Sequence, residues 1–255
     1  MADVGVEFAG VSYALPGGRA GGRGRVLLRG IDLKLEAGTT TALLGRSGSG
    51  KTTLLRMVNG LAMPTSGRVL VDGRDVAAED LIALRRGIGY VIQETGLFPH
   101  MTIERNAGMA LELAGQAEAD RTQRVKDVLA LAGMEFEEFR ARYPWQLSGG
   151  QRQRVGLARA LAANPGVLLM DEPFGALDPI TRAEMQTMLR ELMQRVGKTV
   201  LLVTHDLDEA LYLAGRVVFL ADGEVVADLP AGEVLQSDNP HVRAYVAAVH
   251  RTVQP

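Results

Sequence analysis

The chain has 255 residues, of which 47% are hydrophobic and 23% are charged, and its formal net charge is -2. That length suits one sizeable α/β domain or a core with a subdomain, and the near-neutral charge does not favour a nucleic-acid partner. The chain contains no cysteine, which excludes disulfides and thiolate metal sites. The first residues show no basic stretch followed by an apolar one, and no apolar run of about 18 residues occurs, so we expect a soluble chain that reaches a membrane only through a partner.

The N-terminal region alternates short apolar runs with turn-rich segments, which predicts a small antiparallel sheet. The runs are residues 4–8, 26–28 and 31–35. Tyr13 lies among these strands, and an aromatic residue there is by default a half-buried packing residue. Residues 16–25 contain five glycines and three arginines. The arginines leave a phosphate-binding patch open, but the glycines favour a mobile loop.

Residues 45–52 read Gly-Arg-Ser-Gly-Ser-Gly-Lys-Thr and fill every fixed position of the phosphate-loop pattern G-x-x-x-x-G-K-[ST]. An apolar run enters the segment and a helical pattern leaves it, which argues against a chance Gly/Ser-rich turn that ends in lysine. Backbone amides would meet phosphate oxygens, Lys51 would meet the β- and γ-phosphates, and the Thr52 hydroxyl can ligate Mg²⁺. The residues expected to hold a nucleotide here are Gly45, Ser47, Gly48, Ser49, Gly50, Lys51, Thr52 and Thr53.

The middle of the chain predicts an α/β frame that carries a helical insert. A β-rich run at residues 88–92 is followed directly by Gln93. From about residue 102 to 163 the apolar period is helical, and one helical face ends at Gly133, whose position predicts a C-cap. That face consists of Val125, Val128, Leu129 and Ala132. Ser148 is a good N-cap for the helix that runs to Ala163.

Two further apolar runs predict strands that are buried on both faces. Residues 167–170 lead into Asp171-Glu172, and residues 199–204 lead into His205. Pro179 starts a helix between them, whose apolar side chains, methionines included, we interpret as core packing. Asp-Gly pairs at 72–73 and 222–223 predict hairpin turns. The tail places Val242, Tyr245, Val246 and Val249 on one helical face, which favours packing on its own domain over an intersubunit contact.

Polar groups follow four of the predicted strands. Ligands of parallel sheets lie outside the carboxyl ends of the strands, so parallel strands would bring the phosphate loop, Gln93, Asp171-Glu172 and His205 to one γ-phosphate. Asp171 suits the Mg²⁺ shell, and Glu172 can polarise a water for in-line attack. Gln93 can bridge metal and water, while His205 can donate to the γ-phosphate or the water. Taken singly, the acidic pair fits a solvated loop start and His205 fits surface or cap chemistry.

These motifs together resemble the ATP-binding cassette (ABC) family of transport ATPases over nearly the whole chain. Residues 147–151 match the family's LSGGQ signature, residues 167–172 its Walker B strand, Gln93 its Q-loop, Ala176-Leu177-Asp178 its D-loop, His205 its switch histidine and Tyr13 the aromatic that stacks on adenine. The resemblance implies an α/β P-loop NTPase (RecA-like) core with a mostly parallel sheet, an N-terminal antiparallel β-subdomain and an α-helical subdomain inserted at about 94–160. The ATPase domain would span 1–235 and a helical tail 236–255, with ATP and Mg²⁺ as cofactors.

The resemblance also implies a head-to-tail pair of cassettes that share ATP. The nucleotide held by one copy would be contacted by Ser148, Gly149, Gly150 and Gln151 of the other. A serine-capped helix N-terminus with glycines beside the cap is a reasonable second anion site. Asp178 would reach across the seam, although it also suits the N-cap of the helix that begins at Pro179. Permease subunits, seated near residues 93–100, and through them a solute-binding protein would complete the partners, on the cytoplasmic face of the membrane.

Within the family, residues 84–86, 88–102 and 204–210 look most like importer ATPases for quaternary amines such as glycine betaine, choline or carnitine. Glu94-Thr95 and Arg105 depart from the usual residues there, which bears on the substrate and not on ATP hydrolysis. Importers of amino acids or lipids would share all the catalytic residues. A soluble ABC ATPase acting on nucleic acid or ribosomes is a further alternative, but one cassette with a short helical insert and no basic signal does not favour it.

Overall fold

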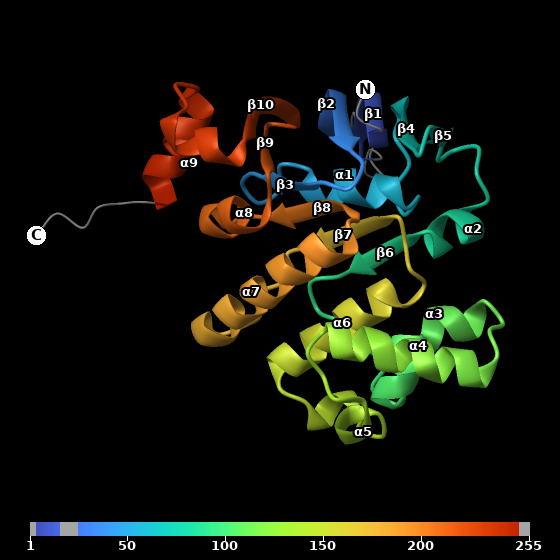
Figure 1. Ribbon diagram of the computed structural model, residues 1–255. Helices are drawn as coiled ribbons and strands as arrows, with labels where there is room; N and C mark the ends of the chain where they lie inside the picture. Colours follow the sequence, from blue (N-terminus) through green and yellow to red (C-terminus); the bar gives the residue numbers. More distant parts are fainter. Residues whose placement is uncertain (1–3, 16–24, 250–255) are drawn as a thin grey trace, which may run out of the picture. The chain divides into compact units, whose positions relative to one another are not determined.

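The structure, a computed structural model, describes residues 4–15 and 25–249 (Figure 1). The predicted glycine loop, apart from Arg25, lies outside the described residues, as does the tail beyond Val249. The chain divides into two compact units, Met1–Leu81 with Leu201–Pro255, and Ile82–Val200. Among the described residues, no helix combines the length and the apolar character needed to cross a membrane.

The first unit contains the predicted antiparallel sheet. Its strands are β1 (Val4–Ala14), β2 (Val26–Glu36), β4 (Ser66–Val71) and β5 (Arg74–Asp75), in the order β2-β1-β4-β5. Alternate apolar side chains such as Val6, Phe8 and Leu33 are buried. The two apolar runs expected in residues 26–35 form one continuous strand, within which Gly30 adopts φ +53°, a conformation that glycine reaches without strain.

A second set of strands in the first unit carries the phosphate loop. It consists of β8 (Thr199–Thr204), β3 (Thr40–Leu44), β9 (Arg216–Ala221) and β10 (Glu224–Pro230), in the order β10-β9-β3-β8. β3 pairs with β9 in parallel, and β10 returns antiparallel through the predicted Asp222-Gly223 turn. Its helices are α1 (Lys51–Val58), α8 (Leu207–Leu213), the 3₁₀ turn η2 (Ala231–Gln236) and α9 (Pro240–Val249).

The tail prediction is confirmed in part. Val242 is fully buried in a core cluster of its own unit, and Tyr245 and Val246 pack against that cluster. Val249 is 43% exposed, because it lies at the last position of α9, beyond the reach of the buried cluster. The helix therefore packs through its first two turns.

The second unit combines two parallel strands with a group of helices. The strands are β6 (Ile88–Val91) and β7 (Val167–Asp171), and the helices are α2 (Leu81–Arg86), α3 (Ile103–Leu113), α4 (Glu118–Leu131), α5 (Phe136–Phe139), the 3₁₀ turn η1 (Pro144–Gln146), α6 (Gly149–Ala162) and α7 (Pro179–Val196). In Figure 1 the helices α3, α4, α5 and α6 lie together. The predicted face of α4 is buried, and Gly133 ends this segment at φ +69°. Met185, Leu189 and Leu192 of α7 are buried, as core packing requires.

Candidate functional site

The phosphate loop joins the buried strand β3 to the first turn of α1. Gly48 and Gly50 adopt φ +79° and +102°, which only glycine occupies without strain. A Cβ at Gly45 would lie 2.2 Å from the backbone oxygen of Leu220. Each of these glycines is therefore required by the shape of the loop, and the backbone stays open to a ligand.

The Lys51 side chain is buried inside the phosphate loop and is hydrogen-bonded to its backbone. Its side chain is only 5% exposed, and its ammonium donates to the carbonyls of Gly45 at 2.7 Å and Arg46 at 3.0 Å. Ser49 is 8% exposed, and its buried hydroxyl finds no hydrogen-bond partner among the described residues. Leaving a buried hydroxyl without a partner costs about 1–3 kcal/mol. A buried cation, an orphaned hydroxyl and the N-terminus of α1 together fit a phosphate group.

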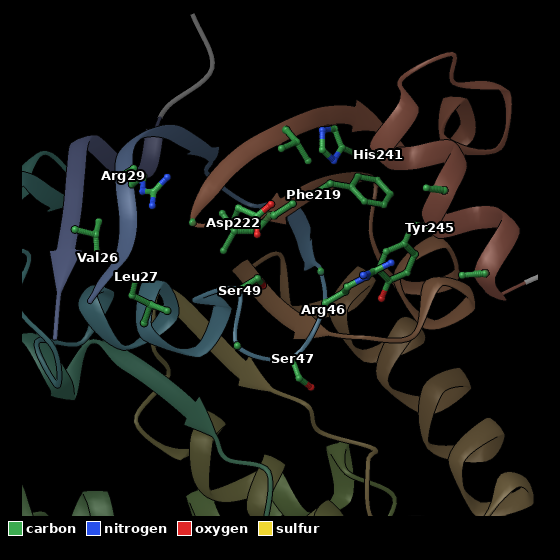
Figure 2. A pocket seen from close by; sticks show the side chains of 18 of the residues that line it. Val26, Leu27, Arg29, Arg46, Ser47, Ser49, Phe219, Asp222, His241 and Tyr245 are labelled. Carbon is green, nitrogen blue, oxygen red and sulfur yellow. The ribbon is translucent and has the colours of Figure 1, made fainter. Parts of the chain in front are cut away.

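A cavity of about 890 Å³ opens beside this loop (Figure 2). That volume is within the range of small-molecule sites. Figure 2 shows Val26 and Arg29 of β2 on one side, Tyr245 of α9 on the other, and the loop between them. It is lined by residues of the loop, of β2 and the residue before it, of β9 and the turn that follows, and of α9, among them Arg25, Arg46, Phe219, Asp222 and His241. The arginines give the cavity cations suited to a phosphate-bearing ligand.

Sequence reasoning missed the contributions of β2, the β9–β10 turn and α9 to this cavity. No sequence pattern links Arg29, Asp222 or Tyr245 to the phosphate loop, and only the folding of distant segments brings them to it. Tyr13 is half-buried on β1, paired with Leu28 in the sheet register, and is not among the residues that line the cavity. Its expected stacking on adenine stays a prediction.

The second unit brings together polar groups that follow β6 and β7. The two strands are parallel, with Val91 opposite Met170, so their carboxyl ends share one edge. Gln93 Nε2 donates to Glu172 Oε2 at 3.4 Å. The Tyr90 hydroxyl donates to Asp171 Oδ2 at 3.4 Å, and Asp171 is only 5% exposed. The amide and the two carboxylates that the sequence singled out thus lie at the same edge of this unit.

Glu172 adopts a left-handed backbone conformation with φ +46°. A non-glycine residue at positive φ is held there only when its surroundings determine it, and such positions gather at functional sites. The carbonyl of Glu172 accepts a hydrogen bond from the amide of Gly175 at 3.3 Å, which fixes the turn after β7. The two adjacent carboxylates have different partners, since Asp171 accepts from Tyr90 and Glu172 accepts from Gln93.

The signature segment forms a capping box at the start of α6. The Ser148 hydroxyl accepts from the Gln151 amide at 3.2 Å, and Gln151 Oε1 accepts from the Ser148 amide at 2.9 Å. This reciprocal pair holds the first turn of the helix in place. Gly149 and Gly150 are the first helical residues, so their amides lie at the N-terminus of α6, the end of the helix dipole that attracts anions.

Asp178 is the N-cap of α7, where its carboxylate accepts from the Thr181 amide at 3.1 Å. The pKa of Asp178 is lowered, chiefly by a hydrogen bond with the Thr181 side chain and to a smaller extent by hydrogen bonds from backbone amides. A Cβ at Gly150 would meet Thr181 at 2.5 Å, so the starts of α6 and α7 lie against one another. The predicted capping role of Asp178 is therefore confirmed.

His205 follows β8 in the first unit, and Asp206 then caps α8 by accepting from the Glu209 amide at 3.1 Å. Lys51, Thr52 and His205 belong to the first unit, whereas Gln93, Asp171 and Glu172 belong to the second. The convergence of these two sets on one γ-phosphate stays a prediction.

The α/β fold and the glycine-shaped loop define a P-loop nucleotide-binding protein. The family model described as "ABC transporter" matches residues 28–175. The chain belongs to the ABC transporter family. Similar solved structures agree: a dimeric post-hydrolysis structure of an ATP-binding cassette bound to ADP and Pi is 35% identical, with a TM-score of 0.79 over 89% of this chain and 98% of the other. The structure of cbiO1 from Clostridium perfringens, part of the ABC transporter complex cbiONQ, is 28% identical to this chain. Its TM-score is 0.81, and the match covers 98% of this chain and 97% of cbiO1. The predicted fold class is confirmed.

Curated relatives narrow the resemblance to one group of transporters. The carnitine transport ATP-binding protein OpuCA of Listeria monocytogenes is 45% identical over 84% of this chain and 54% of its own length. The glycine betaine/carnitine/choline transport ATP-binding protein OpuCA of Bacillus subtilis is 47% identical over 84% and 56%. This chain spans about half the length of these relatives.

Proposed function

We propose that this chain is the ATP-hydrolysing subunit of an ABC importer for quaternary-amine osmoprotectants. The observation that carries the proposal is the phosphate loop, in which the Lys51 ammonium is buried against the loop carbonyls and the buried Ser49 hydroxyl has no hydrogen-bond partner among the described residues. Its relatives are named as transport ATP-binding proteins for carnitine, choline and glycine betaine, and these names support the substrate class. The ATPase domain is assigned to 1–235, with a helical subdomain at about 94–160 and a tail at 236–255.

ATP is assigned to the phosphate loop, with Lys51 neutralising the β- and γ-phosphates. Tyr13 is assigned to the adenine ring, on which its half-buried aromatic face would stack. Mg²⁺ keeps several water and phosphate ligands and takes one or two carboxylates, so Thr52, Gln93 and Asp171 are a chemically suitable set. When bound, the ion neutralises charge on the transferred phosphate.

Glu172 is assigned as the general base that takes a proton from the attacking water, since its carboxylate lies at a strand end with an amide beside it. Gln93, which donates to that carboxylate, would position it and could bridge metal and water. His205 is assigned to donate a hydrogen bond to the γ-phosphate or the water. These roles require no covalent intermediate, because phosphoryl transfer to water depends on positioning and charge.

A second copy of the chain is the proposed partner at the nucleotide. The dimeric ATP-binding cassette bound to ADP and Pi supports this arrangement. The capped start of α6 supplies Ser148, Gly149, Gly150 and Gln151 to the partner's ATP, and Asp178 reaches the seam while it caps α7. Permease subunits and a solute-binding protein are the further proposed partners, with the chain at the cytoplasmic face of the membrane as a peripheral subunit.

ATP hydrolysis by purified chain carrying Glu172→Gln tests the catalytic assignment. We expect ATP binding to change less than about twofold and hydrolysis to fall at least about 100-fold, the range of general-base catalysis. Glu184→Gln, on the exposed face of α7, is the matched control and should hydrolyse ATP normally. Substantial hydrolysis by Glu172→Gln would remove Glu172 as the base.

The loop assignment is tested by titrating a fluorescent nucleotide into Lys51→Ala. Loss of charged hydrogen bonds should weaken binding by about 10- to 100-fold, whereas exposed Lys126→Ala of α4 should bind as the wild type does. For the substrate, the chain is used to recover its permease from a detergent extract, and hydrolysis is measured with glycine betaine, choline, carnitine and amino acids. Stimulation by amino acids alone would reject the quaternary-amine assignment.

A further inference from the structure

The C-terminal helix reaches back to the main chain of His205. The Tyr245 hydroxyl donates to the His205 carbonyl oxygen at 2.6 Å, across 40 residues of sequence. The Tyr245 ring also packs edge-on against Phe219 of β9, with ring centroids 5.8 Å apart and planes at 76°. One side chain of α9 therefore joins a core strand to the residue proposed to sense the γ-phosphate.

The start of α9 is firmly anchored, which fixes the direction of Tyr245. Asn239 Oδ1 accepts from the His241 amide at 2.9 Å, and Asn239 Nδ2 donates to the Val226 carbonyl at 2.8 Å. Val242, one turn ahead of Tyr245, is fully buried in a cluster that includes Leu207 of α8. Because residues three apart share a helical face, the anchor at Val242 directs Tyr245 toward the same part of the core.

The backbone on either side of His205 is held by local hydrogen bonds. The Asp206 amide donates to Thr204 Oγ1 at 3.0 Å, and Asp206 in turn caps α8. The His205 carbonyl is the group of this turn that the long-range bond from Tyr245 constrains. The Cα that carries the imidazole of His205 adjoins this carbonyl, so a hydrogen bond that holds the peptide restricts the backbone from which the side chain extends.

We propose that Tyr245 is a positioning residue for His205 in ATP hydrolysis, a role that rests on the proposed function of His205. The phenol hydroxyl fixes the peptide that follows His205 and so keeps the imidazole in the orientation that meets the phosphate. Tyr245 also lines the cavity beside the phosphate loop, as Arg46 does (Figure 2). Helix α9 thereby becomes part of the hydrolytic machinery of its own cassette.

The test is Tyr245→Phe, which keeps the ring against Phe219 and removes only the hydroxyl. We expect kcat for ATP to fall about three- to tenfold, the range that one hydrogen bond supports, while the Kd for ATP changes less than about twofold. Circular dichroism and thermal unfolding establish that the variant is folded. Arg243→Gln, at an exposed position of the same helix, is the control and should keep the wild-type kcat. His205→Ala is measured in parallel and should lose hydrolysis.

The outcomes separate this inference from the proposed function. A wild-type kcat in Tyr245→Phe, with His205→Ala inactive, would overturn the positioning role and leave the assignment of His205 intact. Equal losses of kcat, nucleotide affinity and thermal stability in Tyr245→Phe would show a purely structural role and also overturn it. Wild-type hydrolysis by His205→Ala would remove the histidine from the proposed function, and the positioning role of Tyr245 with it.

Discussion

Gly223 closes the β9–β10 turn against the strand that lines the cavity, and its replacement by alanine should be costly. Gly223 adopts φ +82°, and a Cβ there would lie 2.3 Å from the backbone oxygen of Leu27. Its carbonyl accepts from the Arg29 amide at 2.8 Å. Gly73 is a matched control, since it ends another Asp-Gly turn at φ +77° with no described atom within 4 Å of a built Cβ.

The difference between the two variants follows from these contacts. Alanine in the left-handed conformation costs about 1–2 kcal/mol in both turns. At Gly223 the backbone must also shift, which adds about 1–3 kcal/mol for the steric conflict and about 0.5–1.5 kcal/mol for the weakened bond from Arg29. We therefore expect Gly223→Ala to be less stable than Gly73→Ala by about 1.5–4.5 kcal/mol, or about 3–18 °C in Tm for a chain of this length.

Thermal unfolding of both variants, followed by circular dichroism, measures this difference. A nucleotide titration at a temperature where both are folded then shows whether the displaced turn disturbs the loop, because Asp222 and Gly223 line the same cavity. Gly223→Ala should bind nucleotide more weakly than Gly73→Ala. Equal losses of Tm in the two variants would refute the argument, because only the Gly223 turn has the close contact with Leu27 and the hydrogen bond from Arg29.

Three further predictions concern the second unit. Ser148→Ala should lower the free energy of unfolding by about 0.5–2 kcal/mol in urea denaturation, and no change would contradict the capping box. Arg159 donates to the carbonyls of residues 95 and 96 at 2.6 and 2.7 Å, so Arg159→Lys should speed amide hydrogen exchange there, and wild-type protection would reject this clamp. The Thr181 side chain, through its hydrogen bond, lowers the pKa of Asp178, so the carboxylate stabilises the fold above its unfolded pKa and loses that effect as pH falls through the lower folded pKa. The unfolding curves of wild type and Asp178→Asn should therefore converge below about pH 4, and a gap that stays constant would contradict this linkage.

Local features of this protein were predictable because they depend on residues a few positions apart. The capping box joins Ser148 to Gln151, three residues along the chain, and hydrogen-bond geometry allows that pair whatever packs nearby. The Asp-Gly turns depend likewise on the left-handed conformations that aspartate and glycine tolerate. Val249 was assigned to a buried face because helical periodicity alone does not show where the core ends.

The sequence by itself determined that the chain has a phosphate loop, capped helices and buried strands that end in polar groups, because composition, spacing and side-chain chemistry fix these locally. Only the tertiary structure decided which distant segments meet them. It set Leu220 against Gly45 and the Tyr245 hydroxyl on the His205 carbonyl, and it opened a cavity beside the loop. Such contacts join residues that are tens to hundreds of positions apart, and they form because burying apolar surface selects one packing of the whole chain.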